Sequence, residues 1–146
     1  MSKIIKIGIC KKSSERISDV EFVEVLPGKG VKNDRHFTSN NDEKKQITLI
    51  ESESIDFYNN KKKIRIPYLN FRRNIVTKDI KLNNLLGKEF SAGSVKLKGN
   101  DLCRPCKHLE TLLGYNDIIK EFLLKGGLRC EILSSGKIYI GDKINF

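Results

Sequence analysis

Two cysteines, Cys103 and Cys106, form a Cys-Arg-Pro-Cys motif and are the side chains of this sequence best suited to chemistry. A strand is predicted before the motif, over Ser94–Gly99, and a helical pattern begins after it. A helix N-terminus and the cation of Arg104 both favour the charged form of a nearby sulfur. A thiolate in such a setting is a nucleophile, a soft metal ligand or a sulfur carrier.

Four interpretations of this motif compete. A thioredoxin-like redox pair fits poorly, because that fold has a cis-proline loop well downstream and Pro105 is the last proline of the chain. A zinc site lacks a second Cys-x-x-Cys pair, and adding His108 still leaves the ligand set short. The other two are a single reactive thiolate and a pair of incidental cysteines at a loop–helix junction. Cys10 and Cys130 lie in predicted strands and are expected to be small core residues.

Arginine is the second informative residue type. The chain has 28 basic residues, of which only seven are arginine. The planar guanidinium suits carboxylate and phosphate in a way that the lysine ammonium does not. In a chain that otherwise prefers lysine, each arginine therefore indicates a position where the planar geometry of the guanidinium is needed. Five of the seven lie in segments with further polar or glycine residues: Arg35, Arg72, Arg73, Arg104 and Arg129.

The neighbours of these arginines suit an anion site. Arg35 stands between Asp34 and His36, where it could bind an anion while Asp34 holds its side chain in place. A single histidine such as His36 is more often a surface residue than a catalytic base. Asn74 follows an Arg-Arg pair, and its amide could bind a loop or a ligand. Over Gly126–Arg129, a Gly-Gly pair either stops a helix or brings backbone N–H groups and a guanidinium to an anion. Together these loops fit a ligand with a phosphate and a soft, thiolate-binding metal or sulfur centre.

Short strands must position these residues. The apolar patterns and turn residues predict strands over Lys3–Cys10, Val20–Leu26, Gln46–Ile50, Asn74–Thr77, Ser94–Gly99, Arg129–Leu133, Lys137–Ile140 and Lys143–Phe146. Helices are expected over Glu51–Asn60, Leu109–Leu113 and Asn116–Leu124, with the last as the main helical segment. Many short strands with few helices predict a mostly β fold, an antiparallel barrel or sandwich with one or two attached helices.

The composition predicts one soluble, cytoplasmic domain. The chain has 146 residues, 38% hydrophobic and 32% charged, and no apolar stretch approaches the roughly 20 residues that span a bilayer. Met1–Ile5 carries no apolar signal core, so the four cysteines are expected to be reduced thiols. The net charge is +10, but the aromatic residues do not interleave with the basic ones, and Lys61–Lys63 is interpreted as a solvated loop. Neither nucleic acid nor a membrane is therefore an expected partner.

Taken in order, several stretches of the chain resemble the molybdenum cofactor sulfurase C-terminal domain family, called MOSC. The matching stretches are Gly30–His36, Gln46–Ile50, Phe71–Val76, Leu82–Phe90 with Gly93, Cys103–Glu110, Gly126–Leu133 and Gly136–Asp142. Their order and spacing cover nearly the whole chain, so we expect one MOSC domain over residues 1–146. Asn33 stands where the family usually has glycine, although asparagine also tolerates a positive φ. Lys78 and Asp79 stand where a glycine is common.

The resemblance implies a β-barrel-like fold and a site for the molybdenum cofactor, of the molybdopterin type, or for sulfur destined for it. By position, its central cysteine is Cys106, acting as the metal ligand or the sulfur carrier. The residues expected to bind the cofactor are Asp34, Arg35, His36, Arg72, Arg73, Asn74, Cys103, Arg104 and Arg129. Pyridoxal phosphate is not expected, because the chain is too short for the separate domain that carries it in fused relatives. We also expect no N-terminal β-barrel extension of the kind that larger relatives have, and therefore a site that is open, or completed by a protein partner or second subunit.

Two functions from different classes follow from this resemblance. In the first, the protein is a small molybdoenzyme in which Cys106 ligates molybdenum and an N-hydroxylated compound is reduced. In the second, Cys106 holds a persulfide or the cofactor and passes it on without turnover. A Cys-x-x-Cys redox protein or a zinc-binding protein is the less favoured alternative. The first two functions need the same thiolate and the same arginines, so the sequence does not choose between them.

Overall fold

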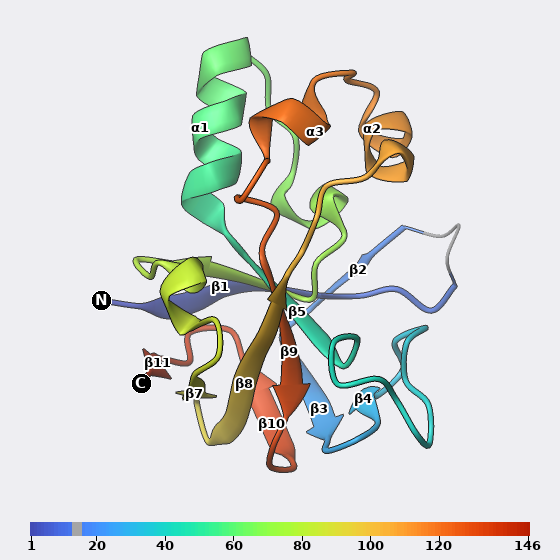
Figure 1. The fold of residues 1–146 in the computed structure, drawn as a ribbon, viewed down its shortest axis with the longest axis vertical. Helices are drawn as coiled ribbons and strands as arrows, with labels where there is room; N and C mark the ends of the chain where they lie inside the picture. The colour runs from blue at the N-terminus through green and yellow to red at the C-terminus, as the bar shows by residue number, and fades with distance from the viewer. Residues whose placement is uncertain (13–15) are drawn as a thin grey trace.

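Strands dominate the structure, a computed structural model that describes residues 1–12 and 16–146 (Figure 1). The described strands are β1 (Lys3–Ile9), β2 (Ser18–Val20), β3 (Phe22–Leu26), β4 (Gly30–Val31), β5 (Ile47–Glu51), β6 (Ile75–Lys78), β7 (Glu89–Ala92), β8 (Val95–Leu102), β9 (Leu128–Ile132), β10 (Gly136–Tyr139) and β11 (Ile144–Asn145). Between them lie α1 (Ser52–Lys62), α2 (Lys107–Leu113) and α3 (Ile118–Glu121), with the 3-10 helices η1 (Tyr68–Phe71) and η2 (Leu82–Leu85). The predicted mostly β fold is confirmed.

The described strands form two sheets. An eight-stranded sheet has the order β11-β7-β8-β9-β5-β6-β1-β2, and a three-stranded sheet has the order β10-β3-β4. Neighbours are antiparallel except β5 and β6, which run parallel. Parallel neighbours need a long crossover connection, and α1 with η1 supplies it. The single strand expected over Val20–Leu26 is divided, because the chain bends at Glu21 and sends β2 and β3 into different sheets.

Two apolar clusters stabilise this arrangement. The larger cluster joins the two sheets and includes Ile7, Val25 and Ile138, all without exposed surface. The second cluster lies beneath the helices, which gather at one end of the strands (Figure 1). Within it the rings of Phe71 and Phe122 pack with their centroids 4.8 Å apart. Burial of this second cluster attaches the helices to the sheet.

The helices differ from the sequence prediction in length and number. The longest is α1, with 11 residues, and the expected main segment over residues 116–124 contains only the short α3. That segment is broken because Phe122 turns into the core and Leu124 adopts a positive φ of 62°. Gly114, with φ of 80°, ends α2 and separates it from α3. Each of the three expected helical ranges overlaps an α-helix, so the described structure has three helices where the fold class expected one or two. None of these helices is long and apolar enough to cross a membrane.

Strand register brings polar residues together at one end of the central strands. Asn74 immediately precedes β6, and the N–H of Gly8 in β1 donates to its carbonyl at 2.7 Å. Thr48 of β5 pairs with Arg129 of β9, and Arg129 pairs in turn with Asp101 near the end of β8. Residues that are distant in sequence therefore lie in one row across β8, β9, β5, β6 and β1.

Candidate functional site

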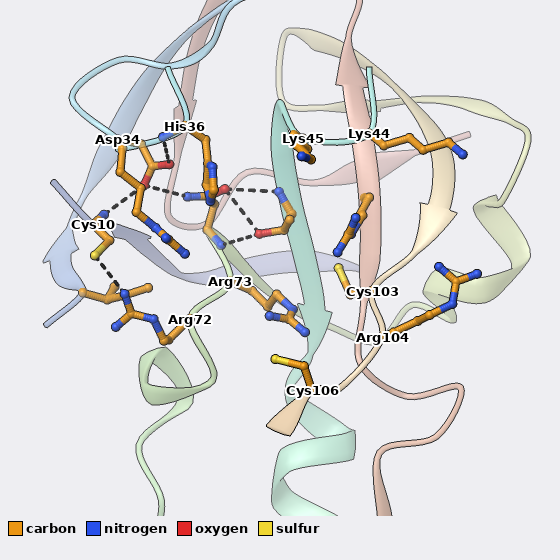
Figure 2. Close-up of a pocket in the computed structure, with 15 residues that line it drawn as sticks. Cys10, Asp34, His36, Lys44, Lys45, Arg72, Arg73, Cys103, Arg104 and Cys106 are labelled. Carbon is orange, nitrogen blue, oxygen red and sulfur yellow. Dashed lines mark hydrogen bonds between the residues drawn. The ribbon is translucent and has the colours of Figure 1, made fainter. Parts of the chain in front are cut away.

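One pocket, a cavity of about 330 Å³, collects the residues that the sequence singled out (Figure 2). The ten predicted site residues all line it: Asp34, Arg35, His36, Arg72, Arg73, Asn74, Cys103, Arg104, Cys106 and Arg129. The lining also includes five residues that were not predicted for the site: Cys10, Ile17, Lys44, Lys45 and Thr48. The pocket lies where the ends of the central strands meet the loops between them, so no single segment forms it.

Asn74 connects the strands around the pocket. Asn74 is buried, with 8% of its surface exposed, and both the oxygen and the nitrogen of its side-chain amide form hydrogen bonds. The Nδ2 group donates to the carbonyl of Gly8 at 3.1 Å and to Oδ1 of Asp34 at 3.4 Å. The Oδ1 atom accepts from the backbone N–H of Thr48 at 3.2 Å and from its hydroxyl at 3.3 Å. Asn74 therefore fixes the backbone from which the preceding Arg-Arg pair projects.

Asp34 organises the loop after β4. Its Oδ1 accepts the N–H of Cys10 at 2.9 Å, and its Oδ2 accepts the N–H of His36 at 3.3 Å. The N–H of Arg35 donates to the carbonyl of Cys10 at 2.7 Å, which closes the loop against the end of β1. Asp34 was expected to hold the side chain of Arg35 in place, but its carboxylate accepts backbone N–H groups, and the ion pairs of the described residues do not include one between Asp34 and Arg35. Asp34 thus shapes the pocket through the backbone.

Cys10 belongs to the pocket wall, which the sequence did not indicate. It is buried, as expected of a core residue, and its thiol donates to the carbonyl of Lys12 at 2.7 Å. The Nη2 atom of Arg72 also lies 3.1 Å from its sulfur (Figure 2). Arg72 follows η1 in a left-handed conformation, with φ of 64°. The interpretation of Cys10 as a simple core residue is therefore corrected: it is a buried thiol beside a guanidinium.

Arg73 is held by backbone carbonyls. Its Nε donates to the carbonyl of Gly126 at 2.9 Å, and its Nη1 donates to that of Phe71 at 3.3 Å. Gly126 itself packs closely against the cysteine motif, because a Cβ there would lie 2.4 Å from the carbonyl oxygen of Cys103. Within the described structure, neither Arg73 nor Arg129 forms an ion pair with a carboxylate. No described carboxylate therefore neutralises their charge.

The two motif cysteines differ in exposure. Cys106 is exposed and caps the start of α2, whereas Cys103 is buried. Burial raises the pKa of the Cys103 thiol, against the opposing charges of Arg73 and Arg129, and Arg129 also hydrogen-bonds this thiol. Complete burial raises the pKa of Cys130 well above its ordinary value. Cys106 is therefore the motif thiol that an incoming ligand can reach.

The pocket is strongly cationic. Its described lining holds seven lysine and arginine side chains against one carboxylate, that of Asp34. Arg104 lies at the rim, with 76% of its side chain exposed, and pairs with Asp101 at 3.2 Å. Desolvation at the pocket wall, followed by the charge of Arg35, lowers the pKa of His36, so this ring adds little positive charge near neutral pH. The electrostatic field of the pocket favours an anionic ligand.

The protein provides few metal ligands in this pocket. Among the residues placed by the structure, no three His, Cys, Asp or Glu side chains are grouped so that they could hold a metal ion. The motif therefore has no ligand set for structural zinc, which takes four. A soft metal bound here would receive the thiolate of Cys106 from the protein and its other ligands from a cofactor.

Comparisons with known proteins identify relatives of this chain. The family model described as MOSC domain matches residues 32–145. The solved structure of the YUAD protein from Bacillus subtilis is similar, with 17% identity, a TM-score of 0.82, and 99% of this chain and 94% of that chain covered. YiiM from Geobacillus stearothermophilus has 18% identity and a TM-score of 0.81, with 99% and 74% covered. YiiM from Escherichia coli has 14% identity and a TM-score of 0.72, with 98% and 68% covered. No curated protein matches the sequence.

Proposed function

The chain belongs to the MOSC domain family, and we propose that it binds a molybdenum cofactor of the molybdopterin type in the pocket beside Cys106. The family is associated with binding of this cofactor. The observation that carries the proposal is the combination of one exposed thiol with a cationic cavity in which the carboxylate of Asp34, the only one among the described lining residues, is engaged by N–H groups.

The residues present fit the chemistry of such a cofactor. A pterin phosphate needs guanidinium forks that are not already neutralised, and Arg73 and Arg129 meet this requirement. Molybdenum in a dithiolene-type cofactor brings most of its own ligands, so a single protein thiolate, that of Cys106, completes a soft-ligand set. When bound, the cofactor would supply redox chemistry at the metal.

The other pocket residues would position these groups. Asn74 holds the strand from which Arg73 projects, and Asp34 holds the loop that carries Arg35 and His36. Arg72, placed against the sulfur of Cys10, would extend the cationic wall. In this proposal the whole chain acts as one MOSC domain, and the ligand enters past Cys106.

Binding of the cofactor is compatible with two functions, which we propose as alternatives. One is a molybdenum-dependent reduction of N-hydroxylated compounds, with Cys106 on the metal. The other is a carrier in which Cys106 holds a persulfide or the cofactor for delivery to a protein partner. The exposure of Cys106 favours the carrier, because a thiol at an open rim is accessible to a second protein.

Metal and pterin analysis tests the proposal. The protein would be produced in a host that makes the cofactor and supplied with molybdate, and then purified without reductant. We expect molybdenum and pterin to copurify with the wild type and molybdenum to be lost from Cys106→Ser. Arg65→Lys is the matched control, because Arg65 is exposed and does not line the pocket. Absence of both molybdenum and pterin from the wild type would contradict the proposal, and reduction of an N-hydroxylated base by loaded protein would distinguish enzyme from carrier.

A further inference from the structure

Arg73 and Arg129 form a positively charged position that protein carboxylates leave unneutralised. Arg73 is fixed by the carbonyls of Gly126 and Phe71, and Arg129 lines the same cavity. Both residues are partly buried, and neither pairs with a carboxylate in the described structure. Carbonyls orient the Arg73 guanidinium without cancelling its charge, and the Arg129 guanidinium lines the same cavity, so this position suits an oxyanion.

A nucleophile faces the same cavity. Cys106 is exposed, and in Figure 2 the Arg73 guanidinium extends toward the side of the pocket where the Cys106 sulfur lies. A simple phosphate would use the guanidiniums and leave the thiol without a function. One class of small ligand that uses both without a metal carries a sulfur atom open to attack, joined directly to an oxyanion.

We propose that this pocket binds thiosulfate and that Cys106 accepts its outer sulfur. The inference rests on the proposed function only in taking Cys106 as the reactive thiol, and it needs no bound metal. The sulfur donor of the site would be a sulfur oxyanion held by Arg73 and Arg129. The protein would then act as a sulfurtransferase.

The transfer balances in atoms and electrons. The Cys106 thiolate attacks the outer sulfur of thiosulfate, and a new sulfur–sulfur bond forms on the cysteine. The bond between the two thiosulfate sulfurs breaks, and its electron pair leaves with the central sulfur as sulfite. Arg73 and Arg129 hold the oxygens of that leaving group throughout. An acceptor thiolate, or cyanide as its probe, then attacks the Cys106 persulfide and restores the thiolate.

The assay measures thiocyanate formed from thiosulfate and cyanide by the purified 146-residue protein. We expect turnover by the wild type and loss to background for Cys106→Ser. Arg73→Lys and Arg129→Lys should each raise the KM for thiosulfate about tenfold, because an ammonium keeps the charge and loses the fork. Arg65→Lys, outside the pocket lining, should match the wild type.

Intact-mass and peptide analysis after thiosulfate treatment without acceptor supplies a second readout. We expect a gain of one sulfur atom on the peptide that contains Cys106. Turnover no greater in the wild type than in Cys106→Ser, or the added sulfur on Cys10 or Cys130, would overturn this inference. Molybdenum and pterin contents measured on the same preparations separate the proposals: cofactor retained without sulfur transfer refutes only the thiosulfate activity, and transfer without any cofactor refutes only cofactor binding.

Discussion

At the residue scale, access to solvent separates the four cysteines. Cys106 is exposed, while Cys10, Cys103 and Cys130 are buried. The motif indicated a reactive thiol, the family resemblance implied that it is Cys106, and the predicted strands indicated burial of Cys10 and Cys130. The sequence did not indicate that Cys10 lies against Arg72, because that contact joins the end of β1 to a turn 62 positions away.

Alkylation should reveal this difference in access. We expect iodoacetamide at near-neutral pH to label Cys106 first in the native protein, because its thiol is exposed. Cys103 and Cys130 should react slowly, since burial raises the pKa of both thiols. Peptide mapping over a time course measures the order of labelling. Unfolded protein is the control, in which all four cysteines should react at similar rates, and native protein labelled first at Cys130 would contradict the assignment.

Asn74 should contribute to stability through its buried hydrogen bonds. Asn74→Ala removes the amide and leaves the carbonyl of Gly8 and the N–H of Thr48 without this partner. We expect the free energy of unfolding to fall by about 2–4 kcal/mol, since each unsatisfied buried group costs about 1–3 kcal/mol. Urea unfolding measures the change. The matched control is Asn83→Ala, an exposed asparagine with one bond to the carbonyl of Leu124, and an equal loss in both variants would refute the special role of Asn74.

At the element scale, local pattern predicted most strands, and long-range pairing decided the rest. Strands near Lys3–Ile9 and Leu128–Ile132 were visible from their apolar patterns. The parallel pairing of β5 with β6 was not, because it depends on the path of α1 and η1 across the sheet. The predicted helix over residues 116–124 failed at Phe122, whose burial against Phe71 outweighed helical pattern.

The Gly-Gly pair before β9 illustrates such a long-range constraint. Gly127 has φ of 112°, and a Cβ there would lie 2.1 Å from the carbonyl oxygen of Leu49 in β5. Gly127→Ala should therefore lower the free energy of unfolding by more than about 3 kcal/mol, because both the backbone conformation and the space are unsuitable. Gly28→Ala is the control, since Gly28 has φ of 73° but nothing within 4 Å of the added Cβ, and about 1 kcal/mol of strain is expected there. If Gly127→Ala and Gly28→Ala unfold at the same urea concentration, the close approach of Gly127 to Leu49 does not contribute to stability.

At the scale of the whole molecule, the site depends on the entire sheet. The pocket combines residues from Cys10 to Arg129, and the sequence could place them together only through the resemblance of ordered segments. Lys44, Lys45 and Thr48 were not singled out, because lysines in a polar loop and a threonine in a strand carry no distinctive signal. The available clue was the matching stretch Gln46–Ile50, which follows Lys44 and Lys45 directly and contains Thr48.

The C-terminal strands should be required for folding. Ending the chain after Leu133 removes β10, which pairs with β3, and β11, which pairs with β7. It also removes Ile138 and Ile144 from the main core, so we expect cooperative unfolding to disappear. Circular dichroism during heating measures this. Deletion of Phe146 alone, a residue 82% exposed, should leave the transition intact. A longer truncation that still unfolds cooperatively would contradict the role given to these strands.

The most direct test of the proposed function is cofactor retention in variants that keep charge and change shape. Pterin and molybdenum would be quantified in wild type, Arg73→Lys, Arg129→Lys and the surface control Arg65→Lys, all produced in the same host. If the pocket binds a phosphate-bearing pterin, the two pocket variants should retain about tenfold less cofactor, because lysine cannot form the two-pronged contact. Arg65→Lys should retain as much as the wild type. Equal retention in all four proteins would contradict the assignment of this pocket.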